Sequence, residues 1–291
     1  MSEPQKPPVE IVAHRGTGKD YPDPVAIQAH RPSAPPENTL PAFALGWERG
    51  VTCELDVYVT SDGKIIVIHD QTTGRTCDRD LNVGASTFAE LRALDAGINK
   101  GSIWAGLRLP LLSEVLEIMP AGRRLYVEMK QGPGIIPPLL EVIDASGKGP
   151  DEIVFISFSI DSITEMKLLR PQFTCYWIVV FEELKPGVWR CGYDHTEPDG
   201  LTFKTTWQQP VDYDALVNMA LNDGSPIDGI DASFVQPDDF PEAMRRLGMP
   251  WGTWAVDDAD VALHLASSGA IQITSNCTDD VRDALRFGLA R

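Results

Sequence analysis

The sequence predicts an α/β fold, a (β/α)8 TIM barrel built as one domain over residues 1–291. The chain has 291 residues, of which 43% are hydrophobic, so it can bury the core of one such barrel or of two small domains. Short apolar runs alternate with longer segments of helical periodicity, which is typical of parallel β/α units, and eight units fit a closed barrel. No linker, internal repeat or long low-complexity tract divides the sequence, which favours one domain.

Most of the predicted strands are short runs rich in Val, Ile, Phe or Tyr. In chain order they are Glu10–Ala13, Val51–Val59, Arg124–Met129, Ile153–Phe158, Cys175–Phe181, Gly229–Ala232, Gly252–Val256 and Ile271–Thr274. The predicted helices are Leu40–Arg49, Thr87–Leu94, Leu111–Ile118, Ile136–Ala145, Ile160–Leu169, Tyr213–Leu221, Asp238–Leu247 and Ala259–Ser267.

Two segments interrupt this alternation. Residues 17–36 are rich in Pro and Ala, and residues 182–210 contain Trp189, Tyr193, Phe203 and Trp207. Loops of this length in a compact domain tend to be lids or binding loops. We therefore expect two long loops, of which the second could cover a pocket or bury an interface.

The chain is strongly acidic, with a formal net charge of -17 from 42 acidic and 25 basic residues. Such a chain is repelled by nucleic acid and by anionic membranes, so an anionic small molecule must be attracted by a metal or by a few local Arg and Lys.

The five cysteines form no CxxC pair, the first eight residues lack an apolar run, and no apolar run approaches the ~20 residues that span a bilayer. These features predict a cytoplasmic protein without membrane insertion; they do not indicate an oligomeric state.

Two carboxylates lie on one face of the second predicted strand. Glu54 and Asp56 are two residues apart, so their side chains point the same way, opposite to Cys53 and Leu55. Paired carboxylates on a buried strand repel each other, and a hard cation such as Mg²⁺ or Ca²⁺ removes that cost. The alternative is a sheet edge that carries two solvated acids.

The third predicted strand ends with a similar pair. Glu128 and Lys130 are again two residues apart at the end of an apolar run. They could supply a third metal ligand and a contact to phosphate. The alternative is a simple ion pair, which contributes little when it is exposed.

Two histidines close apolar runs. His14 follows Glu10–Ala13, and His69 follows Ile65–Ile68 and precedes Asp70. Two histidines suit acid–base catalysis near neutral pH, because one can accept a proton while the other donates one. Asp70 is a candidate to orient His69, although adjacent side chains on a strand diverge.

Ordered motifs over nearly the whole chain resemble the glycerophosphodiester phosphodiesterase family. The motifs are Ile11-Val12-Ala13-His14-Arg15-Gly16, Pro36-Glu37-Asn38-Thr39-Leu40-Pro41-Ala42-Phe43, Glu54-Leu55-Asp56-Val57, Thr60-Ser61-Asp62-Gly63, His69-Asp70, Leu109-Pro110-Leu111-Leu112-Ser113-Glu114-Val115-Leu116, Glu128-Met129-Lys130, Ser157-Phe158, Trp254-Ala255-Val256-Asp257 and Ile273-Thr274. Each motif is weak alone, but the ordered set is specific.

The resemblance implies a (β/α)8 barrel with its site at the C-terminal ends of the strands, and a small-molecule glycerophosphodiester as the substrate. It implies a divalent metal, Mg²⁺ or Ca²⁺, on Glu54, Asp56 and Glu128, with Glu37 beside them as a candidate fourth ligand. The implied acid–base pair is His14 and His69. The residues implied to contact the substrate are Arg15 and Lys130, which would hold the phosphate, and Trp254, which would line the pocket.

The sequence departs from the family pattern in the first motif. A long insert separates His14 from Glu37 and contains a second His-Arg pair at His30, closer to Glu37. We favour His14 as the catalytic residue, because it ends a clear strand and Gly16 follows it, whereas Pro32 after His30 would deny a backbone N–H. A second departure is Thr274-Ser275-Asn276, where the family often has Thr-Asp; it affects local structure more than catalysis.

Other functions fit parts of the pattern. A related phosphodiesterase for lysophospholipid or sphingolipid, with a cyclic phosphate product, would use the same barrel. A catalytically silent barrel that binds a phosphorylated metabolite is a different class, since fold does not fix function. A glycosidase would use paired carboxylates but would not explain the histidines, Arg15 and Lys130.

Overall fold

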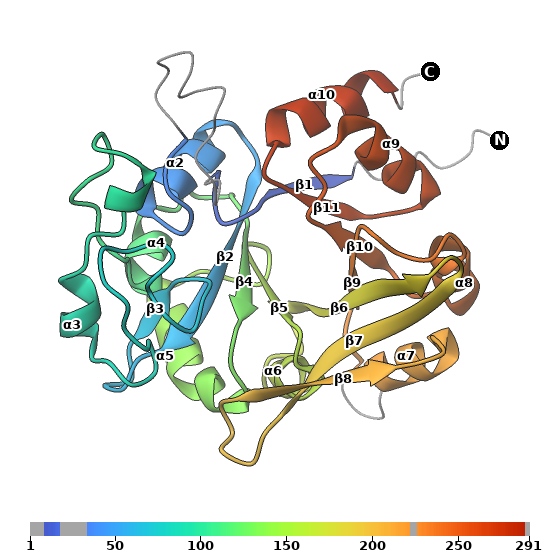
Figure 1. Cartoon of the computed structure of the whole chain (residues 1–291), viewed down its shortest axis with the longest axis horizontal. Coiled ribbons are helices and arrows are strands. Elements are labelled where there is room, and N and C mark those ends of the chain that lie inside the picture. The colour runs from blue at the N-terminus through green and yellow to red at the C-terminus, as the bar shows by residue number, and fades with distance from the viewer. Residues whose placement is uncertain (1–8, 18–33, 222–225, 289–291) are drawn as a thin grey trace.

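The computed structural model describes residues 9–17, 34–221 and 226–288. Eight parallel strands close into a barrel, which confirms the predicted fold class (Figure 1). In chain order they are β1 (Glu10–Ala13), β2 (Thr52–Val59), β4 (Leu125–Met129), β5 (Ile153–Ser157), β6 (Thr174–Lys185), β9 (Gly229–Ser233), β10 (Trp251–Trp254) and β11 (Gln272–Ser275). Each strand pairs in parallel with the next in this order, and β11 pairs with β1. Most of the insert at 17–36, including His30, lies outside the described residues.

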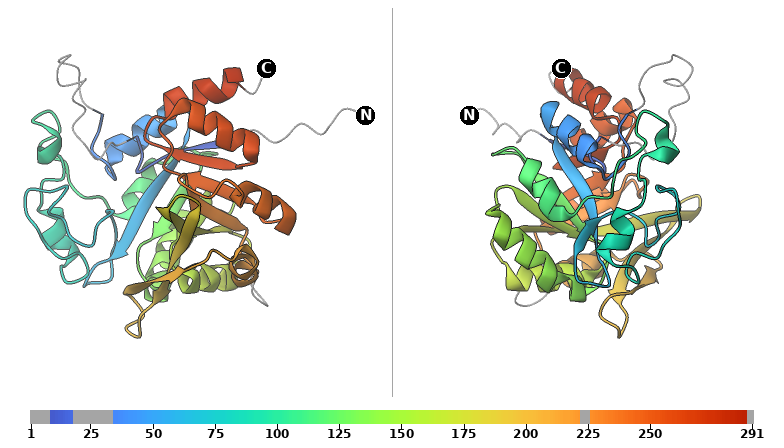
Figure 2. Two further views of the ribbon diagram at one scale, coloured as in Figure 1. Left: turned by 45° about the vertical axis from the view of Figure 1, so that its right-hand side comes forward. Right: turned by 90° about the vertical axis from the view of Figure 1, so that its left-hand side faces the viewer.

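Helices surround the barrel, and the two views of Figure 2 show them on its outside. The predicted helices correspond to α2 (Leu40–Glu48), α3 (Phe88–Arg92), α4 (Leu112–Ile118), α5 (Ile136–Ser146), α6 (Ile160–Leu169), α7 (Tyr213–Ala220), α8 (Phe240–Leu247) and α9 (Ala259–Ser268). A further helix, α10 (Thr278–Gly288), is missing from the predicted set. Its buried residues are only Thr278, Val281 and Leu285, which is too narrow a stripe for a clear helical pattern. No helix in the described part of the chain has both the length and the apolarity to cross a membrane.

The prediction of a loop at 182–210 is wrong. β6 continues past the barrel to Lys185 and is followed by β7 (Val188–Thr196) and β8 (Phe203–Gln208), which form an antiparallel extension with it. The aromatic residues stabilise strands rather than a loop: Tyr193 packs edge-on against Trp177 of the barrel, and Arg190 stacks on Trp207. The β7–β8 turn also contacts the segment after β4, because Gly132 N donates to Leu201 O at 2.8 Å.

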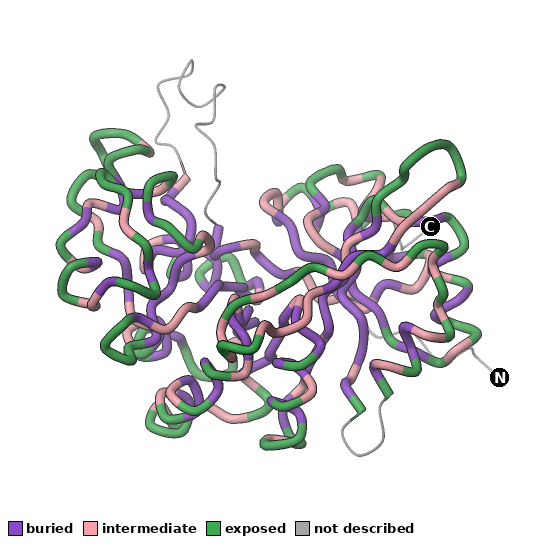
Figure 3. The backbone as a smooth tube through the Cα atoms, turned by 60° about the horizontal axis from the view of Figure 1, so that its bottom comes forward, coloured by how far each residue is buried: buried purple, intermediate pink, exposed green. Residues whose placement is uncertain are grey.

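Side chains alternate between two layers of the core. Cys53, Leu55 and Val57 on β2 belong to the large cluster between strands and helices. The opposite face of the strands lines the barrel interior, where a smaller apolar cluster contains Val12, Tyr126, Val154, Ile156 and Ile178. Figure 3 shows the buried stretches along the strands and the exposed ones on the outer loops and helices. Glu54 and Asp56 therefore point into the barrel, as the period-two argument predicts.

The long connection between β2 and β4 has its own small core. β3 (Ile65–Val67) pairs antiparallel with β2, and Ile66 and Ile68 pack with Leu91 and Leu94 from the region of α3. The cluster anchors the end of β3 beside the barrel, which is where His69 lies.

Candidate active site

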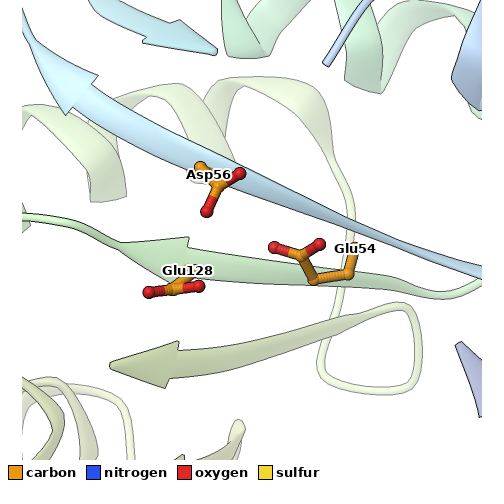
Figure 4. A group of neighbouring side chains, drawn as sticks. All are labelled: Glu54, Asp56 and Glu128. Atoms are coloured by element: carbon orange, nitrogen blue, oxygen red, sulfur yellow. The ribbon is translucent and has the colours of Figure 1, made fainter. Parts of the chain in front are cut away.

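Three carboxylates meet inside the barrel between β2 and β4 (Figure 4). Asp56 lies opposite Glu128 in the parallel register, and Glu54 is two residues earlier on the same face of β2. One oxygen of each carboxylate lies within 4.8 Å of the other two. The exposed fractions of Glu54, Asp56 and Glu128 are 2%, 0% and 7%, so the group is shielded from water.

Burial and mutual repulsion disfavour the state in which all three acids are ionised. Burial raises the pKa of Glu54 well above its usual value, and the negative charges of Asp56 and Glu128 raise it further. Burial also raises the pKa of Glu128 to about 7, although Lys130 opposes the rise. The pKa of Asp56 is lowered: burial alone would raise it, but Lys130 and other cations nearby outweigh that effect.

The oxygens of this group could hold a metal ion. Glu54 Oε1 is buried without a hydrogen-bond partner, and Asp56 Oδ1 has only an ion pair with Lys130 Nζ at 3.1 Å. Such buried acceptors are costly unless something pairs with them. Oxygen-only donors suit hard cations such as Mg²⁺ and Ca²⁺, so the residues present fit a divalent metal.

The segment after β1 wraps over Glu54. Arg15 N donates to Glu54 Oε2 at 2.7 Å and Gly16 N donates to Glu54 O at 3.0 Å. These bonds need a left-handed backbone, with φ of 52° at Arg15 and 80° at Gly16. A Cβ at Gly16 would lie 2.8 Å from Ala42, so the glycine serves close packing against α2. Backbone strain of this kind is typical of functional sites.

The two cations predicted to hold phosphate lie beside the carboxylates. Lys130 Nζ is 2.7 Å from Glu128 Oε1, and Arg15 Nε is 3.7 Å from Asp56 Oδ2. The pKa of Lys130 is raised: burial would lower it, but Glu128 and Asp56 outweigh that effect, so Lys130 stays charged. The site thus combines surplus carboxylate with the buried Arg15 and the largely buried Lys130.

Glu37 lies at the edge of this group and is ion-paired. It accepts hydrogen bonds from Arg15 Nη1 at 3.1 Å and from Arg75 Nη1 and Nη2, each at 2.7 Å. Among the described residues the group of three carboxylates does not include it. Its role as a fourth ligand stays a prediction.

His69 is supported by Asp70, its neighbour in sequence. His69 Nδ1 lies 2.6 Å from Asp70 Oδ1, and Arg75 Nε donates to Asp70 Oδ2 at 2.5 Å. Burial lowers the pKa of His69, while Asp70 opposes that change. Arg75 also binds Glu37, and Glu37 in turn binds Arg15. The side chain of Arg75 therefore links the residues that contact His69 to the residue that contacts Arg15.

His14 is supported from the opposite end of the sequence. Its Nδ1 lies 3.0 Å from Asn276 Oδ1, just after β11. Burial lowers the pKa of His14 to about 4, and the charge of Arg15 adds to this effect. Its neutral form, with one ring proton, therefore dominates near neutral pH.

A known family model, the glycerophosphoryl diester phosphodiesterase family, matches residues 14–274. The chain belongs to this family. A glycerophosphodiester phosphodiesterase of Caldanaerobacter subterraneus is 35% identical over 167 residues, which are 55% of this chain and 63% of that protein. Another, of Bacillus subtilis, is 31% identical over 52% of this chain and 58% of its own length. The chain thus spans less than two thirds of these relatives.

Solved structures share the fold of this family member. A phosphodiesterase of Oleispira antarctica, solved with the product sn-glycerol-3-phosphate, has a TM-score of 0.71 at 21% identity, over 95% of this chain and 96% of that one. The structure of the putative glycerophosphoryl diester phosphodiesterase of Agrobacterium tumefaciens has a TM-score of 0.72 at 16% identity, over 98% of this chain and 100% of that one. Both likenesses establish the barrel.

An aromatic pair borders the site of this family member. Trp254 Nε1 donates to Asp231 O at 3.1 Å, which fixes the indole at the end of β10. Phe158 packs edge-on against it with ring centroids 5.4 Å apart, and Lys130 Nζ is 5.9 Å from the Phe158 centroid. The pair forms an apolar wall beside Lys130.

Three supporting residues were not singled out from the sequence. Asn38 donates from Nδ2 to Asp56 Oδ2 at 2.8 Å, Arg75 joins Glu37 to Asp70, and Asn276 contacts His14. Asn38 lies inside the Pro-Glu-Asn-Thr motif and has a left-handed φ of 53°, so the motif itself was a signal. Arg75 and Asn276 lie in no sequence motif of this kind, and their partners Glu37 and His14 are 38 and 262 positions away.

Proposed function

We propose that this protein hydrolyses glycerophosphodiesters to sn-glycerol 3-phosphate and an alcohol with the help of a bound divalent metal, Mg²⁺ or Ca²⁺. The observation that carries the proposal is the meeting, at one end of one barrel, of three buried carboxylates, the cations Arg15 and Lys130, and two hydrogen-bonded histidines. Family membership and the bound product in the Oleispira antarctica structure support the choice of substrate.

Glu54, Asp56 and Glu128 are the proposed metal ligands, with Glu37 as a candidate fourth. When bound, the metal supplies positive charge that stabilises the extra negative charge of the transition state. Arg15 and Lys130 direct further positive charge at the non-bridging oxygens of the phosphate. Both cations are already held in place by carboxylates, so they need little reorganisation when the substrate binds.

His14 and His69 are the proposed acid–base pair. One histidine accepts the proton of the glycerol hydroxyl next to the phosphate, and that oxygen forms a bond to phosphorus while the bond to the alcohol breaks. The other histidine protonates the departing alcohol oxygen. In the second half the pair exchanges roles: the histidine that gave its proton accepts one from a water, and the water oxygen bonds to phosphorus. The ring P–O bond then breaks, and the other histidine protonates the released glycerol oxygen to give glycerol 3-phosphate.

Trp254, with Phe158, lines the pocket beside the phosphate. The apolar wall excludes water from one side of Lys130 and offers a flat surface to the carbon atoms of glycerol. His14 rather than His30 is the proposed catalytic histidine, because it is supported by Asn276 and the family match begins at its position.

The test is release of glycerol phosphate from glycerophosphocholine and glycerophosphoethanolamine with EDTA, Mg²⁺ or Ca²⁺. We expect metal-dependent release that falls by about 10²- to 10⁴-fold in His14→Ala, the usual worth of a catalytic acid or base, and persists in His30→Ala. Loss in His30→Ala alone would move the catalytic base into the insert. No release with either substrate and any metal would contradict the activity and favour a lysophospholipid or sphingolipid phosphodiesterase or a silent binder.

The cyclic intermediate has a test of its own. A diester that lacks the hydroxyl next to the phosphate cannot close the ring, so its turnover should be very poor. Efficient hydrolysis of such a diester would contradict this version of the reaction while leaving metal-dependent hydrolysis in place.

A further inference from the structure

Closure of the barrel brings Asn276 to His14. The two residues are 262 positions apart, but β1 pairs with β11 so that Ala13 lies opposite Ser275, and His14 N donates to Ser275 O at 3.0 Å. This backbone bond fixes the start of each following segment. The Asn276 side chain then reaches the imidazole, with Oδ1 at 3.0 Å from Nδ1.

Asp257 determines which way the Asn276 amide faces. Its Oδ1 accepts from Asn276 N at 2.7 Å and its Oδ2 accepts from Asn276 Nδ2 at 3.0 Å. An ionised carboxylate can only accept, so the NH₂ group must point at Asp257. The carbonyl oxygen of the amide must therefore point at His14.

The direction of the amide determines where His14 keeps its proton. The carbonyl oxygen only accepts, so Nδ1 must be the donor in this contact. A neutral imidazole carries one proton, which leaves the lone pair on Nε2. Burial that keeps the pKa of His14 low adds to the population of this neutral form.

We propose that Asn276, oriented by Asp257, is a positioning residue that holds the His14 proton on Nδ1 and makes Nε2 the atom that exchanges a proton with the substrate. The assignment rests on the proposed function for its catalytic consequence. The hydrogen-bond chain Asp257–Asn276–His14 stands on geometry alone.

The first measurement is the ¹⁵N NMR spectrum of the histidine rings above pH 7, where the neutral form dominates. The chain has five histidines, and the spectrum of His14→Ala identifies the signals of His14. We expect a protonated Nδ1 and an unprotonated Nε2 in the wild type. In Asn276→Ala we expect a mixture of both tautomers. A protonated Nε2 in the wild type would overturn the proposal whether or not the enzyme hydrolyses a diester.

The second measurement is steady-state kinetics on variants whose folding is checked by circular dichroism. Asn276→Ala should lower kcat by about 10- to 100-fold, as loss of a supporting hydrogen bond behind a functional histidine commonly does, with KM nearly unchanged. The double variant Asp257→Asn with Asn276→Asp reverses the bond between these two side chains but keeps an acceptor facing His14 Nδ1, so it should restore the tautomer and most of kcat. Wild-type kcat in Asn276→Ala, or no rescue by the exchange, would overturn the proposal.

Ser275→Ala is the matched control. Ser275 Oγ donates to Asp257 Oδ1 at 3.2 Å, the oxygen that also accepts from Asn276 N. The Ser275 side chain does not contact the imidazole of His14. Loosening this loop without touching the amide should leave the tautomer and kcat as in the wild type. A loss in Ser275→Ala equal to that in Asn276→Ala would show that loop rigidity, not proton placement, is responsible, and would overturn the proposal.

Discussion

The barrel has a charged cluster at each end, and the two are built differently. At the N-terminal end, which we call the base cluster, Glu10 accepts from Arg124 Nη1 at 2.5 Å, Tyr126 OH at 3.0 Å and Thr52 Oγ1 at 2.6 Å. At the other end, the site cluster of Glu54, Asp56 and Glu128 contains a carboxylate oxygen with no hydrogen-bond partner. Both carboxylate oxygens of Glu10 therefore have donors within the chain. The site cluster, by contrast, holds a buried acceptor without a donor, which lowers the stability of the folded state.

The difference indicates which cluster has a chemical role. A structural ion pair is complete within the protein, because a buried unpaired charge costs several kcal/mol. The site cluster keeps acids whose pKa values are raised by burial and mutual repulsion, as expected of a site whose proposed partner is an ion from outside the chain. Matched substitutions at the two ends can therefore separate function from stability.

The largest expected effect is on catalysis. Glu54→Gln removes a proposed metal ligand with almost no change in volume, and kcat/KM should fall by about 1,000-fold, equivalent to about 4 kcal/mol of transition-state stabilisation. Glu10→Gln makes the same chemical change in the base cluster and should leave kcat/KM nearly unchanged. Diester hydrolysis assays on both variants make the comparison. Equal losses in the two variants would mean that Glu54 acts only through stability.

The next effect is on thermal stability in the presence of metal. A metal bound by the native state alone adds about 2.7 kcal/mol to the free energy of unfolding at a concentration a hundredfold above its Kd. We therefore expect Mg²⁺ or Ca²⁺ to raise Tm by several degrees in the wild type and in Glu10→Gln, but not in Glu54→Gln. Differential scanning calorimetry with and without EDTA measures this. An equal rise in Glu54→Gln would place the ion elsewhere.

A smaller effect should separate two arginines of the β2–β4 connection. Arg75 and Arg92 each bind a glutamate with two nitrogens, Glu37 and Glu114 respectively. Only Arg75 is joined to the site, through Asp70 and His69. Arg75→Gln should lower kcat by about tenfold, in the range for loss of a supporting contact. Arg92→Gln should lower Tm alone; a similar kcat in both variants would contradict the role of Arg75.

The smallest effect is on the pH dependence of stability without metal. Glu54 and Glu128 have pKa values raised in the folded state, so the native state binds more protons than the unfolded state above their usual pKa. The free energy of unfolding should therefore decline as pH rises from about 5 through the raised value of Glu128, which is about 7. Glu54→Gln should flatten this decline, and Glu10→Gln should not. Urea denaturation at several pH values with EDTA measures it, and a decline that is just as steep in Glu54→Gln would contradict the repulsion.

The features that could be predicted from the sequence are those that depend on local periodicity. The barrel strands follow from apolar runs, and the common direction of Glu54 and Asp56 follows from strand alternation. The helix α10 and the β7–β8 extension were not predicted, because a three-residue buried stripe is a weak helical signal and an aromatic-rich insert resembles a long loop. The roles of Arg75 and Asn276 could not be predicted, because their partners Glu37 and His14 are distant in sequence and meet them only in the folded chain.

The central claim is that the site cluster is completed by a metal ion, and isothermal titration of metal-free protein with Mg²⁺ and with Ca²⁺ tests it most directly. We expect one bound ion per chain for the wild type and for Glu10→Gln, and greatly weakened binding for Glu54→Gln. Binding that is unchanged in Glu54→Gln, or no binding of either ion by the wild type, would contradict it.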